Sequence, residues 1–247
     1  MAALYDAFVF EDDLPLYLEL ARSQGERVLE VACGTGRVVA PLVKAGFQVV
    51  GVDASPHMLA LARTKLDGVG ADADLVEADM RSFRLDRLDF DLAIIAVKSF
   101  AYLLERDDQL RCLQTVYAHL RPGGLLAIDF LHPRPEFVAP PIGVLRDDLV
   151  QRGHGDGCLT VSRVESVISV DLARQTRVIR SAYEVVDARG AVVEKRFVEW
   201  PYRWTYRFEA EHLLERAGFA IEALYGGYRR ESFTADSKAM LFVARKG

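Results

Sequence analysis

Small residues and acids around one predicted strand end form the part of the sequence best suited to binding a nucleoside. Residues 28–37 read VLEVACGTGR, a buried-strand pattern that runs into a turn with Ala32, Gly34 and Gly36 and then into a helix. Small side chains let a ligand approach the backbone, and a helix N-terminus offers unpaired N–H groups. Asp53 ends the next strand pattern, where a carboxylate can accept hydrogen bonds from both hydroxyls of a ribose. Together these residues predict a nucleoside cofactor.

Two further residues bear on which cofactor this is. A dinucleotide site requires a third glycine three residues after Gly36, for close packing of helix and strand, but Val39 stands there. Just before the turn lies an acid, Glu30. S-adenosylmethionine has no pyrophosphate but carries an α-amino group that an acid or carbonyl groups near this turn can hold. The pattern favours S-adenosylmethionine, while a nucleotide-dependent oxidoreductase and a non-catalytic S-adenosylmethionine-binding module stay open as alternatives.

The motifs resemble those of the class I, Rossmann-like S-adenosylmethionine-dependent methyltransferases, in particular the small-molecule enzymes with a β-rich insert. The matching segments are residues 30–36 for the first motif, Asp53 for the ribose acid, 77–80 for the adenine contact, 91–99 for the fourth strand and 120–124 for the turn before strand five. One departure is Ala32, where the family usually has glycine, so the turn must accommodate a Cβ. The resemblance implies an enzyme that uses S-adenosylmethionine as cofactor.

The resemblance also implies a set of cofactor-binding residues. They are Tyr5, Glu30, Ala32, Cys33, Gly34, Gly36, Asp53, Ala54, Met58, Asp79, Met80 and Ala96. Tyr5 belongs to an N-terminal segment that often folds over the cofactor in the family, so we expect it to close the site and take part in catalysis. Ordinary packing of the N-terminal helix is the alternative for Tyr5.

Catalytic candidates follow the strands, because ligands of parallel α/β sheets bind beyond the carboxyl ends of strands. Lys98 and Ser99 follow the fourth predicted strand, and His132 follows the fifth. Methyl transfer is an in-line displacement, so orientation and water exclusion can supply much of the acceleration and a base is optional. We predict His132 as the base, which matters most for a hydroxyl acceptor; alternatively it satisfies backbone groups before Pro133. Lys98 either anchors an acceptor anion, acts as a base if desolvated, or reaches solvent.

Alternating strand and helix patterns predict the fold. We expect an α/β protein with a doubly wound, mostly parallel seven-stranded sheet, an antiparallel last strand and an antiparallel β insert. The Rossmann-like domain comprises residues 1–139 and 207–247, and residues 140–206 form the insert, a lid over the acceptor site. The clearest strands are 28–31, 48–52, 91–97, 125–130, 220–225 and 239–244, the helices are 37–45, 56–66, 107–120 and 208–217, and the insert has strands 159–170, 176–186 and 192–206.

Aromatic residues near the end of the insert are candidates for binding the acceptor. In residues 200–208 the aromatic residues Trp200, Tyr202, Trp204, Tyr206 and Phe208 alternate with Pro201, Arg203, Thr205 and Arg207. A strand would place the aromatic side chains on one face and the arginines on the other. The aromatic face either packs the insert onto the main sheet or lines the acceptor pocket, where an arginine would bind an anionic group. The predicted substrate-binding residues are Lys98, Ser99, Trp204, Tyr206 and Tyr228.

Composition limits the partners and the location. The 247 residues carry a formal charge of −5 with no basic tract, which disfavours nucleic acid. No run approaches the ~20 apolar residues of a membrane-spanning helix, and no export signal opens the chain. Three widely spaced cysteines suggest neither a metal site nor disulfides, and fit the cytoplasm. We predict a small-molecule or short peptide acceptor methylated on nitrogen or oxygen; the sequence allows a homodimer but does not fix the oligomeric state.

Overall fold

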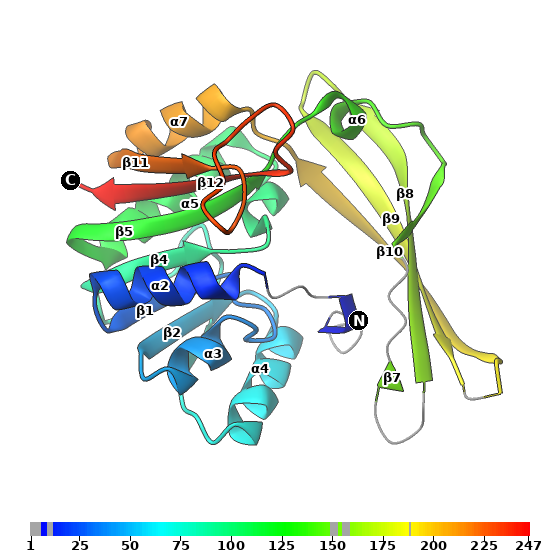
Figure 1. Cartoon of the computed structure of the whole chain (residues 1–247), viewed down its shortest axis with the longest axis horizontal. Coiled ribbons are helices and arrows are strands. Elements are labelled where there is room, and N and C mark those ends of the chain that lie inside the picture. The colour runs from blue at the N-terminus through cyan, green and yellow to red at the C-terminus, as the bar shows by residue number, and fades with distance from the viewer. Residues whose placement is uncertain (1–5, 9–11, 149–152, 155–158, 188) are drawn as a thin grey trace. The chain divides into compact units, whose positions relative to one another are not determined.

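The chain divides into two compact units in the computed structural model, which describes residues 6–8, 12–148, 153–154, 159–187 and 189–247 (Figure 1). The main unit comprises residues 11–132 and 205–247. The sheet unit comprises residues 1–10 and 133–204. Tyr5, predicted to close the cofactor site, lies outside the described residues.

The main unit is built on a seven-stranded sheet in the order β11-β12-β5-β4-β1-β2-β3. Its strands are β1 (Arg27–Val31), β2 (Gln48–Asp53), β3 (Asp74–Glu77), β4 (Phe90–Ile95), β5 (Leu120–Leu131), β11 (Phe219–Tyr225) and β12 (Ala239–Lys246). Every pairing is parallel except those of β12, which runs antiparallel to both β11 and β5. The predicted fold class, including the antiparallel last strand, is confirmed.

Helices cover both faces of this sheet because its strands are apolar on both sides. In β1, Val28 packs in one buried cluster while Leu29 and Val31 pack in the other, as the alternation of side chains along a strand requires. The first cluster takes residues from α2 (Leu14–Gln24), α3 (Val39–Lys44) and α4 (Pro56–Gly68); the second takes residues from η2 (Ser99–Tyr102), α5 (Arg106–His119) and α7 (Arg207–Arg216).

The start of β5 differs from the predicted turn at residues 120–124. Leu120 already pairs with Phe90 of β4, and the next pair in register is Leu92 with Leu125. The four residues between therefore bulge out of the ladder, where Gly123 has a φ of +74°. A proline and two glycines fit such an excursion as well as they fit a turn, so the sequence pattern alone did not distinguish the two.

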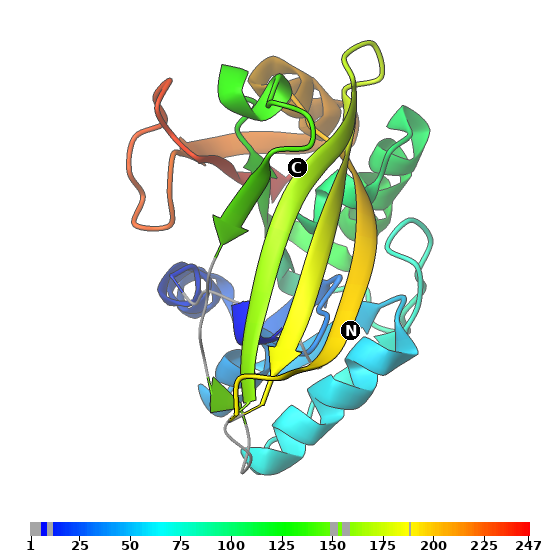
Figure 2. The same cartoon turned by 90° about the vertical axis from the view of Figure 1, so that its right-hand side faces the viewer.

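The sheet unit contains a five-stranded antiparallel sheet in the order β10-β9-β8-β6, with β7 paired to β8. Its strands are β6 (Leu145–Asp148), β7 (Gly153–His154), β8 (Leu159–Asp171), β9 (Thr176–Val186) and β10 (Val192–Arg203); η1 (Asp6–Phe8) and α6 (Pro135–Val138) complete it. The long strands β8, β9 and β10 lie side by side in Figure 2. That residues 140–206 form a lid over the acceptor remains a prediction.

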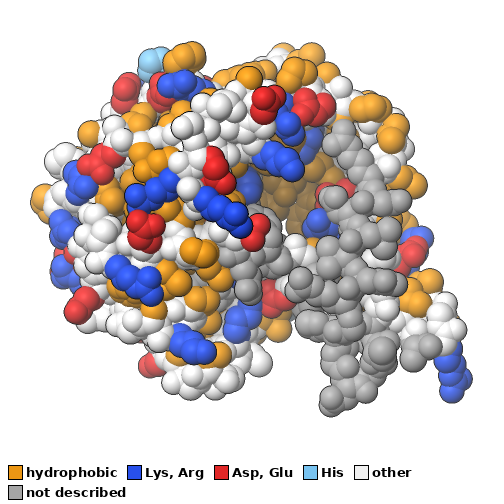
Figure 3. All heavy atoms as spheres, viewed as in Figure 1, with side chains coloured by type: hydrophobic (Ala, Val, Ile, Leu, Met, Phe, Trp, Pro, Cys, Tyr) orange, Lys and Arg blue, Asp and Glu red, His pale blue; other side chains and the backbone are white. Residues whose placement is uncertain are grey.

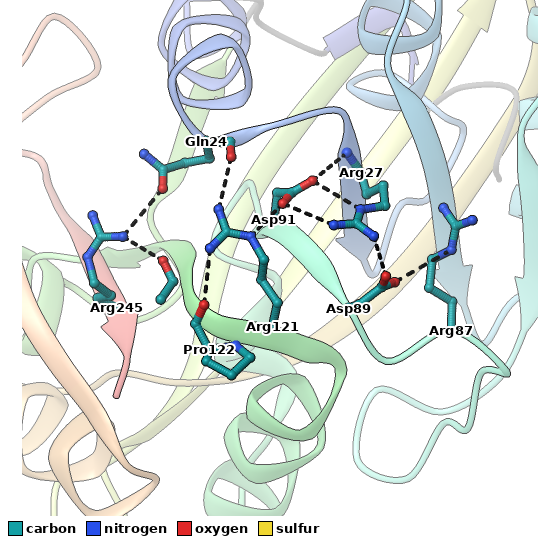
Figure 4. A network of polar contacts seen from close by, with 9 residues as sticks. Gln24, Arg27, Arg87, Asp89, Asp91, Arg121, Pro122 and Arg245 are labelled. Carbon is teal, nitrogen blue, oxygen red and sulfur yellow. Dashed lines mark hydrogen bonds and ion pairs between the residues drawn. The ribbon is translucent and has the colours of Figure 1, made fainter.

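Polar contacts hold the amino ends of the main-unit strands together (Figure 4). Asp91, at the start of β4, accepts hydrogen bonds from the backbone N–H (3.0 Å) and Nε (3.2 Å) of Arg27 on β1. It also accepts one from Arg121 Nε on β5 at 2.6 Å. Arg121 in turn donates to the Gln24 carbonyl at the end of α2, and Arg245 of β12 donates to the Gly123 carbonyl. One buried carboxylate therefore links three neighbouring strands.

We expect Asp91→Asn to lower the free energy of unfolding by about 2–3 kcal/mol, less than the roughly 3–5 kcal/mol typical of a broken buried pair because both arginines are partly exposed. Burial alone would raise the pKa of Asp91, but hydrogen bonds from Arg121 and Arg27 hold it below its usual value. Its stabilisation is therefore present above pH ~4 and lost as the pH falls further. Urea unfolding at several pH values measures both effects.

Asp107→Asn is the matched control, since Asp107 pairs with Arg106 on the surface, where both side chains are 71% exposed. Surface pairs contribute about 0–1 kcal/mol, so this variant should unfold almost as the parent does. An Asp91→Asn variant that lost no more stability than the control, or the same amount at pH 3 as at pH 7, would contradict the role given to Asp91.

Candidate active site

The turn after β1 adopts a backbone conformation that glycine favours. Gly34 and Gly36 have φ values of +55° and +74°, and Ala32 has +58°. A left-handed alanine costs roughly 1–2 kcal/mol relative to the usual helical or extended regions. A Cβ added at Gly34 would meet no atom within 4 Å, whereas one at Gly36 would lie 3.1 Å from the Ala62 Cβ of α4. Gly36 thus permits helix packing, and Gly34 leaves open space beside the backbone.

The missing third glycine of a dinucleotide motif has a counterpart in the neighbouring strand. Val39 is fully buried, and a Cβ at Gly51 in β2 would lie 3.2 Å from its Cγ2 and 2.9 Å from the Cys33 Sγ. Close packing of helix and sheet is therefore achieved by a small residue in β2. Cys33 is buried there, which raises the pKa of its thiol well above the usual value, so it acts as a packing residue of the turn.

Asp53 is fixed at the end of β2 by two backbone groups. Its Oδ2 accepts the Gly34 N–H and its Oδ1 accepts the Ser55 N–H, both at 2.8 Å. Each carboxylate oxygen can accept more than one hydrogen bond, so the two ribose hydroxyls of a nucleoside still find acceptors. The next residues, Ala54 and Ser55, lead into α4, where the Ser55 Oγ accepts the Met58 N–H at 3.3 Å. This places the half-buried Met58 at the first turn of α4.

Glu30 carries a buried oxygen without a partner. Its side chain is 3% exposed, and its Oε2 has no hydrogen bond within the described part of the chain. Burial raises the pKa of Glu30 to about 8, while the nearby Arg37 and the Val39 N–H act in the opposite direction. An unpartnered buried acceptor beside the glycine turn suits a cationic donor. Glu30 Oε2 therefore suits the α-amino group of S-adenosylmethionine, and the open space at Gly34 lets that cofactor approach the protein backbone.

An ion pair that the sequence analysis did not identify joins α2 to this turn. Arg37 Nη1 and Nη2 bind Asp13 Oδ1 and Oδ2 at 2.5 and 2.6 Å, and the side chains are 8% and 0% exposed. In this bidentate pair the Arg37 guanidinium binds both oxygens of Asp13, and its charge also acts on the nearby Glu30. No local pattern in the sequence pairs Asp13 with Arg37, because the two lie 24 residues apart.

The chain is also strained where it leaves β4. Val97 and Lys98 follow one another with φ values of +57° and +58°, and each such residue costs about 1–3 kcal/mol. The Ala96 carbonyl accepts the N–H of Ser99 at 3.1 Å and its hydroxyl at 2.7 Å. The Ser99 hydroxyl thus helps close this turn. The strand predicted to reach Val97 ends at Ile95.

Three residues, which we call the Asp129 cluster, meet at this turn: Lys98, Asp129 and Tyr228. Asp129 is fully buried in β5 and accepts the Lys98 N–H at 2.8 Å and the Tyr228 hydroxyl at 2.5 Å. Lys98 Nζ lies 3.3 Å from Asp129 Oδ2 and 3.0 Å from the Tyr228 oxygen. Burial and the neighbouring Asp129 raise the pKa of Tyr228 strongly, so it stays a neutral phenol. Lys98 and Tyr228 were predicted as site residues, whereas Asp129 was not.

His132 is oriented by the loop that follows β11. Its Nδ1 lies 2.8 Å from the Ser237 carbonyl, so Nδ1 carries the proton and Nε2 keeps its lone pair in the neutral ring. Its ring centroid is 4.9 Å from that of Phe233, over which the Arg207 guanidinium lies at 5.8 Å. The main unit therefore brings one predicted base and one predicted anion-binding arginine against the same phenylalanine.

Asp79 follows β3 and is held by an arginine. Its two carboxylate oxygens lie 2.9 and 3.0 Å from Arg81 Nε, and Arg81 also binds Asp108. The hydrogen bond from Arg81 lowers the pKa of Asp79. Met80, next to it, packs against the apolar cluster formed with α5 and α7. The predicted adenine contact thus comprises a fixed carboxylate followed by a half-buried methionine.

The predicted aromatic face of the insert is not continuous. Trp200 and Tyr202 lie in β10, but that strand ends at Arg203 and the alternation ends with it. Trp204 is 2% exposed and belongs to the sheet unit, with its ring 6.5 Å from that of Phe137. Tyr206 is 46% exposed and immediately precedes α7 in the main unit. The strand stops here because its partner β9 begins only at Thr176, and Gln175 before it has a φ of +55°.

The described residues provide neither a membrane-spanning helix nor a cluster of metal ligands. No described helix is both long and apolar enough to cross a membrane. Within the same residues, no group of three or more His, Cys, Asp or Glu side chains is placed to hold a metal ion.

Comparison with known proteins gives consistent matches. A family model described as a methyltransferase domain matches residues 28–124. The cypemycin N-terminal methyltransferase of Streptomyces sp is 30% identical over 227 residues, which cover 90% of this chain and 84% of that protein. Other curated relatives match over only about half of their own length.

Solved structures match over nearly the whole chain. DesVI of Streptomyces venezuelae is similar with a TM-score of 0.79 at 26% identity, covering 99% of this chain and 96% of that one. CalS10 from Micromonospora echinaspora, an amino pentose methyltransferase solved with S-adenosylmethionine bound, has a TM-score of 0.74 at 25% identity, covering 99% and 95%. By sequence and by fold, the chain belongs to the class I, Rossmann-like S-adenosylmethionine-dependent methyltransferases, and it is an enzyme that uses S-adenosylmethionine as its cofactor.

Proposed function

We propose that this enzyme methylates a nitrogen of a small-molecule or peptide-like acceptor, with oxygen as the second candidate atom. The observation that carries the proposal is the match to the cypemycin N-terminal methyltransferase, which extends over 90% of the chain and so includes more than the cofactor-binding motifs. CalS10, named as an amino pentose methyltransferase, supports the same class of acceptor. Both named relatives act on amino compounds.

The cofactor residues of the proposal lie along the carboxyl edge of the main-unit sheet. Asp53 would bind the ribose hydroxyls and Glu30 the α-amino group. The cofactor would lie against the backbone of the turn that contains Ala32, Cys33, Gly34 and Gly36. We assign the adenine to Ala54, Met58, Asp79 and Met80, and the Ala96 carbonyl to the methionyl end. Support comes from the placement of these residues at one edge, where α/β sheets bind ligands.

Bound S-adenosylmethionine supplies an electrophilic methyl group on a sulfonium. The protein must then hold the acceptor in line with it and exclude water, which can account for most of the acceleration. An amine needs only its lone pair and loses its proton to solvent afterwards. A hydroxyl gains from a base, and the unprotonated Nε2 of His132 is the group we assign to that role.

We also propose a cytoplasmic enzyme that does not act on nucleic acid. Lys and Arg alternate with Asp and Glu across the face seen in Figure 3, and no side of that view carries a basic patch. Cys33 and Cys112 are buried thiols, which suits a reducing compartment. A homodimer remains an open prediction.

Asp53→Ala should weaken binding of S-adenosylhomocysteine at least ~100-fold, because hydrogen bonds to a charged partner contribute about 1.5–3 kcal/mol each. Titration calorimetry measures the Kd. Asp74→Ala, which removes an exposed carboxylate of β3, is the control and should bind as the parent does. A parent enzyme that bound NAD and no S-adenosylhomocysteine would overturn the proposal.

Glu30 should release a proton when the cofactor binds. Its pKa of about 8 leaves most of the carboxyl protonated at pH 7, and an ammonium group beside Oε2 favours the ionised form. Calorimetry with S-adenosylhomocysteine in two buffers of different ionisation enthalpy should therefore report release of up to about one proton at pH 7. The release should vanish in Glu30→Gln, with weaker binding; buffer-independent heat in the parent would refute the assignment.

The raised pKa of Glu30 also predicts how the stability of the ligand-free protein depends on pH. The folded state holds the Glu30 proton more tightly than the unfolded chain, whose carboxyl has a pKa of 4.5, so stability falls as the pH rises from 4.5 towards 8. Glu30→Gln should lose less stability over this range than the parent. Thermal unfolding of both proteins at pH 5 and pH 8 measures the difference.

His132→Asn should separate the two acceptor classes. Loss of a general base costs about 10²–10⁴ in rate, so turnover of a hydroxyl acceptor should fall by at least about 10², while an amine acceptor should lose less than about tenfold. Transfer of label from S-adenosylmethionine to a panel of amines, phenols and carboxylates measures this. His212→Asn is the control, since that side chain is 80% exposed on α7. Equal losses for both classes would show that His132 is not a base.

A further inference from the structure

The turn after β4 holds two consecutive residues in a conformation that L-amino acids rarely adopt. Val97 and Lys98 have φ values of +57° and +58°, and for a β-branched residue such as valine a positive φ is a genuine outlier. Residues in such regions persist only where the surrounding structure over-determines them, and they concentrate at functional sites. A contact that holds this turn must therefore exist.

Asp129 supplies that contact through both of its oxygens. Oδ1 accepts the backbone N–H of Lys98 at 2.8 Å, while Oδ2 accepts the Tyr228 hydroxyl at 2.5 Å and lies 3.3 Å from Lys98 Nζ. The same carboxylate thus binds residue 98 by its main chain and by its side chain. Asp129 is fully buried, so water does not compete for these bonds.

We infer that Asp129 is a positioning residue, which holds the Val97–Lys98 turn in its left-handed form and thereby sets the Ala96 carbonyl and the Lys98 side chain for ligand binding. The inference rests on the proposed function, which places the cofactor at this edge of the sheet. Asp129 itself touches no ligand in this scheme. Its effect passes through the turn, since both residues of the turn would relax towards extended or right-handed backbone without it.

A purely structural role for Asp129 is the competing explanation, and the chain offers a matched control. Asp91 lies at the opposite end of β4, is also buried, and also accepts a backbone N–H from a neighbouring strand, that of Arg27 at 3.0 Å. Both carboxylates therefore stabilise the same sheet by the same kind of contact. Only Asp129 faces the edge at which the cofactor is proposed to bind.

The test compares Asp129→Asn with Asp91→Asn by titration calorimetry with S-adenosylhomocysteine. It is done without denaturant, under conditions in which both variants are folded. Asparagine cannot accept from the Lys98 N–H and from Tyr228 at once without turning its NH₂ group towards a donor. We expect Asp129→Asn to weaken binding by about tenfold or more, because the turn loses charged hydrogen bonds that hold it in its binding conformation. Asp91→Asn should keep the parent Kd. Equal Kd values for parent and Asp129→Asn would overturn the inference.

A second comparison tests whether backbone strain is the link. Glycine adopts a positive φ without cost, so in a Val97→Gly background the Asp129→Asn change should weaken binding by a smaller factor than in the parent. An undiminished factor would refute positioning through the turn. If Asp129→Asn fails to fold, Tyr228→Phe serves in both backgrounds, with a smaller effect of the same sign. Parent protein that binds no S-adenosylhomocysteine would refute the proposed function instead.

Discussion

Carboxylates that accept backbone N–H groups, two of them buried, hold this fold together at the points where its strands begin and end. Asp91 binds the Arg27 N–H at the start of β1, Asp53 binds the Gly34 N–H after β1, and Asp129 binds the Lys98 N–H after β4. In each case the carboxylate belongs to a neighbouring strand. A backbone donor at a strand end has no ladder partner, so these contacts satisfy it and fix the register of loop against sheet.

This carboxylate–backbone interaction has a different role at each edge of the sheet. At the amino edge, Asp91 is surrounded by arginines that tie three strands into one ion-pair network. At the carboxyl edge, the acceptors bind the N–H groups of Gly34 and Lys98, which both have left-handed backbone. Stability concentrated at one edge permits strain at the other, which is where a ligand must approach the backbone closely.

Periodicity and turn chemistry predicted the main-unit fold because its signals are local. Apolar strand residues alternate between the two helix layers, and the turn after β1 carries the small residues its φ values require. What remained hidden depends on contacts far apart in sequence. Nothing in the sequence distinguishes Asp129 from the other residues of its apolar strand, and Asp13 meets Arg37 only in three dimensions. Gly51 makes room for Val39 from the neighbouring strand, so the helix does not need a glycine there.

In the insert, by contrast, a local sequence pattern predicts a longer strand than the structure contains. The aromatic alternation predicts a strand that reaches Tyr206. β10 nevertheless ends at Arg203, because β9 begins only at Thr176 after a left-handed Gln175, and α7 begins soon after. A period-two pattern states which residues share a face only while the ladder lasts, and sequence does not mark where pairing stops. A site residue inferred from such a pattern can be given a role only once the pairing of its strand is known. Asp53 and His132 differ, because each lies at or just after the carboxyl end of a buried parallel strand, and the sheet fixes its position.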